Sequence, residues 1–282
     1  MVVVVHVDGI LAHAKDQATM DGFAAELGQK FRLKDMGDAG YYMGCHITRN
    51  RKARELKFDQ HLYVESIVRR FDIKKATKIP TALGVSTLSK ADEPRNPEEE
   101  EKMRQAVGAL IMRTATMTRP DIACAVRAVA RFCENHGPAH KKAVMKIFQY
   151  LLHTKEWGIT YDGQGCGLCM EAYTDSDFEA CLDTRRPVSG AVLILAKGAI
   201  SWHSRMQVTA SGTSKAEYVA LSEVVKQAQE FMEPSMRVDA VNVFEDNEGG
   251  IKLAINKHAS RRTKHIDVKH LVGNASDAQG FE

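Results

Sequence analysis

Four carboxylic acids in the second half of the sequence have the type and spacing expected of a two-metal hydrolytic site. They are Asp175 in Tyr-Thr-Asp-Ser-Asp, Glu217 in Ser-Lys-Ala-Glu-Tyr, Asp246 in Val-Phe-Glu-Asp-Asn and Asp267 in Lys-His-Ile-Asp-Val. Clustered carboxylates repel one another unless cations neutralise them, and Mg²⁺ prefers hard oxygen ligands. Since two such ions can support in-line phosphodiester hydrolysis, the acids predict a nuclease site.

Each acid taken alone also has an ordinary structural explanation. Glu217 follows Ser214 at the spacing of a capping box, in which a glutamate only closes the start of a helix. Asp175 fits a turn, Asp246 fits the cap of the helix that follows it, and Asp267 fits an exposed acid among basic neighbours. The occurrence of all four in one element order, and no single acid, is what indicates a site.

The helix expected over residues 214–232 would aim Glu217 at the sheet. Its apolar stripe continues through Leu221, Val224, Ala228 and Phe231. Such a stripe faces the core in an amphipathic helix. An acid at the top of that stripe points toward the neighbouring strands, where Asp175 could lie.

The hydrophobic patterns predict a mixed α/β fold. For the last part of the chain they predict strands at 169–175, 188–195, 199–203, 240–245 and 263–268, and helices at 214–232 and 248–256. The first two of these strands after residue 187 form a hairpin around Lys197-Gly198. Before this last part of the chain, the patterns predict helices at 98–115, 120–135 and 139–153. The first of these helices is capped by Asn96 and has Pro97 at its first position.

The N-terminal third predicts an α+β arrangement that leads into a linker. The expected elements are a strand–turn–strand over 2–11, a helix over 16–32 with Met20, Phe23, Leu27 and Phe31 at helical spacing, strands at 41–48 and 56–58, and a helix presenting Tyr63, Ile67 and Phe71. Residues 77–97 are weakly patterned and read as a linker. A buried-type strand at the very start suggests that the chain begins inside a larger unit.

Bulk composition is that of an ordinary globular protein. The 282 residues are 44% hydrophobic and 27% charged, with a net charge of +3, and the length fits one or two domains. Charge is more telling locally, because residues 257–270 carry five Lys or Arg against one acid, a net of 5 − 1 = +4. That stretch fits a site that grips phosphates beside a metal, or a solvated basic loop.

Cysteine usage and hydropathy predict an intracellular protein, cytoplasmic or nuclear and not secreted. Cys166 and Cys169 form a C-x-x-C pair, but no second pair follows at zinc-finger spacing. A zinc site there is the weakest of the readings, and a loop with two reduced thiols is the simpler one. No apolar run reaches the length of a membrane span, so no membrane partner is expected.

Many ordered motifs resemble the end of the Pol polyprotein of copia-type LTR retrotransposons. In the first half they are His6-Val-Asp-Gly-Ile-Leu, Lys34-Asp-Met-Gly, Tyr42-Met-Gly, Asp59-Gln-His-Leu-Tyr, Thr118-Arg-Pro-Asp-Ile and Gln149-Tyr-Leu. In the second half they are Tyr173-Thr-Asp-Ser-Asp-Phe, Thr184-Arg-Arg with Ser189-Gly, Ile200-Ser-Trp, Ala216-Glu-Tyr-Val-Ala-Leu, Asp246-Asn and Arg262-Thr-Lys-His-Ile-Asp. The resemblance covers nearly the whole chain.

The resemblance implies three parts. They are a partial reverse transcriptase palm and thumb remnant over 1–95, a helical connection over 96–157, and an RNase H-like domain with a mixed sheet over 158–282. The resemblance to the family fades after His270. The final helix of the RNase H-like domain would therefore be missing, and that domain would be truncated at its C-terminus.

The resemblance also implies a substrate, cofactors and site roles. The RNA strand of an RNA–DNA hybrid would be cut with two Mg²⁺ (or Mn²⁺) ions, held by Asp175, Glu217, Asp246 and Asp267, with Asp175 bridging the two ions. Nucleic-acid contacts would come from Arg262, Lys264, His265 and Lys269. Recognition would rest on the shape of the hybrid and its 2′-hydroxyls. Protein partners are not implied.

One departure from the family argues against polymerase activity. The family's Tyr-Val-Asp-Asp reads His6-Val-Asp8-Gly9 here, and glycine has no oxygen side chain to hold a metal. The degenerate motif at Asp8 and Gly9 predicts that this polypeptide has no DNA polymerase activity. A catalytically inactive fragment with weak nucleic-acid binding is the alternative to an active RNase H.

Overall fold

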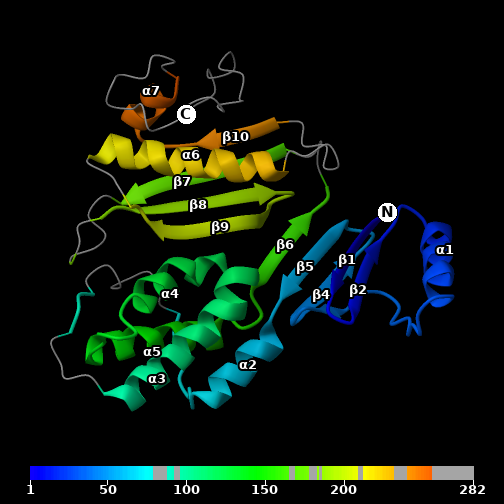
Figure 1. Cartoon of the computed structure of the whole chain (residues 1–282), viewed down its shortest axis with the longest axis horizontal. Coiled ribbons are helices and arrows are strands. Elements are labelled where there is room, and N and C mark those ends of the chain that lie inside the picture. Colours follow the sequence, from blue (N-terminus) through cyan, green and yellow to red (C-terminus); the bar gives the residue numbers. More distant parts are fainter. Residues whose placement is uncertain are drawn as a thin grey trace.

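Over the residues that it describes, the computed structural model shows a mixed α/β protein with three β-sheets and a helical core, which confirms the predicted fold class in its coarse form (Figure 1). It describes residues 1–78, 88–91, 96–164, 169–177, 183, 186–208, 212–231 and 240–255. None of the helices in these ranges is long and apolar enough to cross a membrane.

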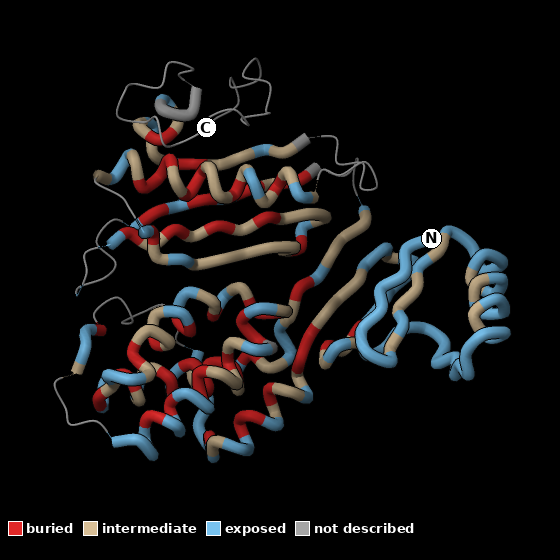
Figure 2. Tube along the Cα trace, in the orientation of Figure 1, coloured by how far each residue is buried: buried red, intermediate tan, exposed pale blue. Residues whose placement is uncertain are grey.

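The N-terminal hairpin is largely uncovered (Figure 2). Strand β1 (Val2–His6) pairs antiparallel with β2 (Gly9–His13), and every residue of β1 is exposed. Helix α1 (Gln17–Gly28) begins where Asp16 accepts a hydrogen bond from the Thr19 N–H. The helix buries none of its residues against the described part of the chain. The expected apolar stripe therefore forms a helix whose Met20, Phe23 and Leu27 are only half-buried, and Phe31 beyond its end is 62% exposed.

A second sheet joins the N-terminal third to a strand much later in the chain. Its order is β3 (Tyr41–Tyr42), β4 (Cys45–Asn50), β5 (Glu55–Asp59) and β6 (Gly158–Asp162), all antiparallel. The sequence alone does not predict β6 as a partner of β5.

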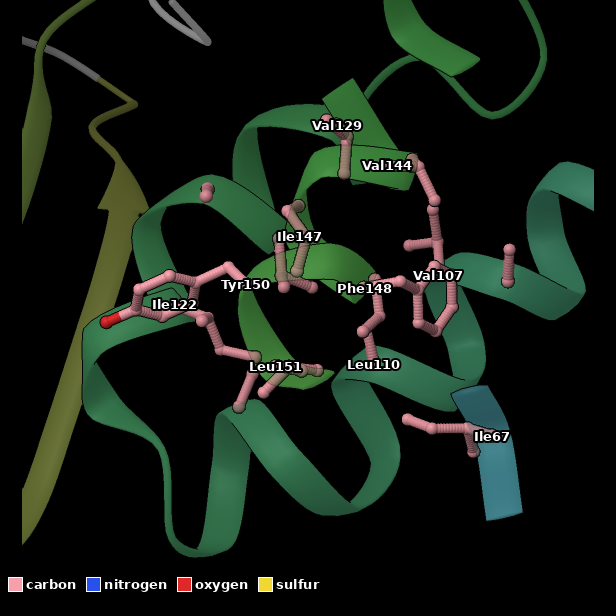
Figure 3. Close-up of a cluster of buried hydrophobic side chains, with 14 of the residues drawn as sticks. Ile67, Val107, Leu110, Ile122, Val129, Val144, Ile147, Phe148, Tyr150 and Leu151 are labelled. Carbon is pink, nitrogen blue, oxygen red and sulfur yellow. The ribbon is translucent and has the colours of Figure 1, made fainter. Parts of the chain in front are cut away.

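A helical layer, most of which follows the linker, has its own apolar core (Figure 3). Its helices are α2 (His61–Arg70), α3 (Pro97–Ala109), α4 (Ala123–Ala130) and α5 (Pro138–His153). Phe148, Leu151 and Ile122 are fully buried among them. Asn96 caps α3 by accepting hydrogen bonds from the backbone N–H groups of the next turn, as predicted.

Two helices of this layer are shorter than predicted. The expected helix over 98–115 becomes π-helical over Leu110–Ala115, where the Thr114 hydroxyl donates to the Leu110 carbonyl at 2.6 Å. Such side-chain bonding competes with the regular helical ladder. The expected helix over 120–135 consists of a 3₁₀ turn at Pro120–Ile122 followed by α4, which ends at Ala130.

The third sheet and the elements beside it position three of the four predicted acids. The sheet has the order β10-β7-β8-β9, in which β7 (Cys169–Asp177), β8 (Val188–Leu195) and β9 (Gly198–Met206) are antiparallel and β10 (Ala240–Phe244) runs parallel to β7. Helix α6 (Thr213–Phe231) covers one face of the sheet, and α7 (Glu248–Ile255) packs beside the start of α6 (Figure 1).

The turn between β8 and β9 differs from its prediction by one residue. Positive φ angles at Ala196 and Lys197 make these two residues the turn, whereas Gly198 begins β9. A Cβ on Gly198 would lie 2.5 Å from the ring of Tyr161. The glycine is therefore needed for the close approach of β6 to this hairpin. The positive φ angles that the turn requires are adopted by Ala196 and Lys197 instead.

Candidate functional site

Three of the four predicted acids come together at the end of the third sheet where strands β7 and β10 finish. Asp175 lies near the end of β7, paired with Gly190 of β8, and is therefore a strand residue and no turn. The β7–β10 register, continued two residues past Phe244, sets Asp246 level with Asp175. Both acids are exposed at this end of the sheet.

Glu217 reaches the same edge from helix α6. The side chains of Leu221, Val224 and Ala228 pack against the sheet, as the stripe predicts. Glu217 is only 4% exposed, and its carboxylate accepts a hydrogen bond from the backbone N–H of Ser176, the residue after Asp175. This hydrogen bond from Ser176 connects the Glu217 carboxylate to β7. The structure therefore does not give Glu217 the role of capping the start of α6.

Asn247 explains why Asp246 is free for another role. The Asn247 side chain accepts a hydrogen bond from the Gly250 N–H at 3.0 Å, and its carbonyl accepts one from the Ile251 N–H. Asn247 thus caps helix α7. The ordinary explanation of Asp246 as the helix cap does not hold.

A further acid, Glu245, belongs to the cluster and was missed by the sequence reasoning. It follows Val241 and Val243 at the alternate spacing of one strand face, and those valines pack against the core beneath α6. Glu245 is 9% exposed and accepts a hydrogen bond from the Asn247 N–H at 3.2 Å. A charged residue that continues the apolar alternation of β10 one residue past its end is the signal that could reveal it.

The buried acids are held at an electrostatic cost. Burial, together with the charges of Asp175 and Asp246, raises the pKa of Glu217 to about 7. Burial, with smaller contributions from Glu217, Asp246 and Asp175, also raises the pKa of Glu245 to about 7. The carboxylates of Asp175, Glu217, Glu245 and Asp246 therefore repel one another, and protons or cations that neutralise them are bound favourably.

Two oxygens of this acidic cluster have no partner within the described structure. They are Oε2 of Glu217 and Oε2 of Glu245, both buried. Unpaired buried carboxylate oxygens are costly, and hard divalent cations accept such ligands. The donor set of Asp175, Glu217, Asp246 and Glu245 thus fits Mg²⁺ or Mn²⁺ chemically.

The acidic cluster is more open than a single tight ion site. Within the described residues, one group of three donors has all its ligand atoms within 4.8 Å of one another, and it is His46, Asp59 and His61. The acids of β7, α6 and β10 do not meet that spacing. Ligands shared between two ions about 3.5–4 Å apart would be spread more widely than the ligands of one ion.

The remaining predicted site residues lie elsewhere. Asp267 and the predicted nucleic-acid contacts fall outside the described residues, as do parts of the C-x-x-C loop; those contacts are Arg262, Lys264, His265 and Lys269. Asp8 lies in the exposed turn of the N-terminal hairpin, and Gly9 begins β2 opposite His6.

One family model matches the N-terminal part of the chain. It describes a reverse transcriptase (RNA-dependent DNA polymerase) and covers residues 1–83. No solved structure matches the chain.

Several curated relatives match most of the chain. The Retrovirus-related Pol polyprotein from transposon TNT 1-94 of Nicotiana tabacum is 34% identical over 96% of the chain, and the Pol polyprotein from transposon RE1 of Arabidopsis thaliana is 28% identical over 96%. The chain spans about a fifth of the length of these relatives, 21% and 19% respectively. The Uncharacterized mitochondrial protein AtMg00810 of Arabidopsis thaliana is 28% identical over 79% of the chain and 90% of its own length. The chain belongs to the Pol polyprotein family of copia-type retrotransposons.

Proposed function

We propose that the third sheet with α6 and α7 is an RNase H-like unit that hydrolyses the RNA strand of RNA–DNA hybrids with divalent metal ions. The observation that carries this proposal is the meeting of Asp175, Glu217 and Asp246, brought from β7, α6 and β10 to one edge. Three antiparallel strands with a fourth added parallel to the first, and a helix between them in sequence, support the same unit.

In this proposal the metal ions are two Mg²⁺ or Mn²⁺ held by Asp175, Glu217, Asp246 and Asp267. When bound, such ions supply an activated water and stabilise charge on the leaving oxygen. The role of the protein is to hold the carboxylates in place. The Ser176 N–H fixes the Glu217 carboxylate, and α6 excludes water from behind it.

We also propose the division implied by the resemblance, with a partial palm and thumb remnant over 1–95, a helical connection over 96–157 and the RNase H-like part over 158–282. Strand β6 at the start of the third part pairs with β5 of the first. The sheet that holds the acids begins after it, at Cys169. The degenerate pair Asp8 and Gly9 supports the absence of polymerase activity in this polypeptide.

The basic segment of residues 257–270 is the proposed contact to nucleic acid. Its Arg262, Lys264, His265 and Lys269 would bind phosphates without reading base sequence. A matched assay would compare an RNA–DNA hybrid with duplex DNA of the same sequence.

Cleavage of a labelled hybrid in Mg²⁺ tests the enzymatic proposal. The chain should cut the RNA strand, and Asp175→Asn should remove the activity, because the amide keeps the shape of the side chain and loses its charge. Asp177→Asn, at the exposed end of the same strand, is the matched control and should remain active. Equal cleavage by the parent and Asp175→Asn would refute the proposal.

A catalytically inactive fragment with weak nucleic-acid binding is the second candidate. It is favoured by the similarity to AtMg00810, whose whole length is close to the matched region, and by Gly9 in the polymerase motif. Under it, hybrid affinity should fall steeply as salt rises while no cleavage occurs. Affinity that does not change with salt would exclude binding through phosphates.

A further inference from the structure

Two imidazoles and one carboxylate meet in the second sheet, far in sequence from the acidic cluster. His46 on β4 is the direct partner of Asp59 on β5 in the antiparallel ladder, and His61 begins helix α2 two residues later. The Nδ1 atom of His61 lies 2.5 Å from Oδ1 of Asp59, and Nδ1 of His46 lies 3.5 Å from Oδ2. The two rings meet edge to face, 5.1 Å between centroids.

The carboxylate of this His–Asp–His cluster is buried and the rings are accessible. The side chain of Asp59 is 4% exposed, whereas those of His46 and His61 are 41% and 23% exposed. Burial opposes ionisation of Asp59, but hydrogen bonds from His61 and His46 and the charge of Lys57 outweigh it and hold its pKa below the ordinary value. An ionised carboxylate thus forms the floor of the cluster, with imidazole nitrogens around it.

We propose that His46, Asp59 and His61 bind one late first-row divalent metal ion, with Zn²⁺ as the representative. Their ligand atoms all lie within 4.8 Å of one another, close enough for one ion to contact each of them after small side-chain rotations. Two imidazoles and a carboxylate are a ligand set of known zinc sites with three protein ligands, in which water takes the fourth position. The partly exposed rings leave that position accessible to solvent.

The ligand types separate this site from the acidic cluster. Imidazole suits zinc, copper and nickel, whereas carboxylates and water suit magnesium. Lys57 is the nearest competing cation, with Nζ 3.6 Å from Oδ2 of Asp59. That ammonium also donates to the Glu156 carbonyl at 2.7 Å. It shares Oδ2 of Asp59 with His46, whereas Oδ1 is the oxygen that faces His61.

Calorimetric titration of the full chain with Zn²⁺ in excess Mg²⁺ tests the proposal. One saturable zinc ion per chain is expected, and His46→Ala and His61→Ala should each lose it. His153→Ala, an exposed histidine at the end of α5, is the matched control and should bind as the parent does. Asp59→Asn should also lose the ion, and the two histidine variants decide the matter if loss of the buried carboxylate prevents folding.

A double Cys166→Ser and Cys169→Ser variant excludes the other zinc ligands that the sequence offers. It should retain the ion, and Co²⁺ bound to the parent should show no thiolate-to-cobalt charge-transfer band. Absence of saturable binding, retention of the ion in both His46→Ala and His61→Ala, or its loss in the cysteine double variant would each overturn the proposal.

Discussion

Gly250 of helix α7 lies against Glu217 of helix α6, and a Cβ added to the glycine would stand 3.1 Å from the Cβ of the glutamate. This close approach sets α7, and with it the Asn247 cap and the adjacent Asp246, beside the buried acid. A single contact between two short stretches of backbone thus helps to align side chains from α6 and from the end of β10.

Gly250→Ala should therefore gain less stability than an alanine placed in open space on a helix. Replacing glycine with alanine in a helix interior usually stabilises by about 0.5–1 kcal/mol. At Gly250 the crowding against Glu217 should offset that gain. Gly22→Ala on α1, where nothing lies within 4 Å of the new Cβ, is the control that should show it. Urea unfolding of both variants measures the difference, and equal gains would contradict the contact.

The raised pKa values of Glu217 and Glu245 predict a definite pH dependence of stability. Between the ordinary value of 4.5 and about 7, the folded chain keeps protons that the unfolded chain has released. The two protonated carboxyls stabilise the fold fully below the ordinary pKa. This contribution is lost as the pH rises through the pKa of the folded state.

Glu217→Gln removes that dependence at one position. Relative to the parent, this variant should gain roughly 1–3 kcal/mol of unfolding free energy between about pH 5 and pH 8, since one pKa unit corresponds to about 1.4 kcal/mol. Glu245→Gln should do the same. Glu26→Gln on the exposed face of α1 is the control for replacing a glutamate by glutamine. A flat curve for Glu217→Gln would show that its carboxyl is not held in an unfavourable environment.

Magnesium should stabilise the chain by relieving repulsion among the four carboxylates. A ligand that binds the folded state alone raises the unfolding midpoint, by roughly 2–4 °C for about 1 kcal/mol of binding free energy. The shift should be smaller in Asp175→Asn than in the parent. Thermal scans in Mg²⁺ and in potassium chloride of matched ionic strength separate site binding from general screening, and identical shifts in the two salts would argue against a site.

The helical layer depends on a buried arginine. Arg119 is 2% exposed, pairs with Asp121 at 2.7 Å and donates to the carbonyl and hydroxyl of Thr154. Asp121→Asn leaves this guanidinium buried with a neutral neighbour and should cost about 2–4 kcal/mol.

An exposed ion pair provides the control for that prediction. Glu99 and Lys141 pair between α3 and α5 with 47% and 44% of their side chains exposed, so Glu99→Gln should cost less than about 1 kcal/mol. Guanidinium unfolding of both variants measures the two costs. Similar values would mean that the burial of Arg119 does not determine its contribution.

Local patterns predicted most of the elements because they depend on neighbouring residues. The Asn96 cap and the core stripe of α6 are read from residues a few positions apart, and both appear as predicted. The stripe on α1 shows the limit of such patterns. Periodicity predicts that a helix forms, but how far its apolar face is covered depends on residues distant in sequence, and the described chain leaves that face only half-buried.

The candidate site shows the same limit more sharply. Asp175, Glu217 and Asp246 were found because their motifs are local and familiar in type. Glu245 was missed because its importance comes from burial beneath α6, a tertiary property. His46 and Asp59 face each other only through the pairing of β4 with β5, and no spacing in the sequence encodes that meeting.

The pairing of β5 with β6 has a consequence for how the chain acquires its shape. Strand β6 emerges from a ribosome only after α2 to α5 have been made, so the second sheet lacks its last strand while residues 60–157 are synthesised. Such distant pairings are slow to form. Until β6 arrives, the outer hydrogen-bonding groups of β5 are open to other extended chains, which makes the nascent polypeptide a natural client for chaperones.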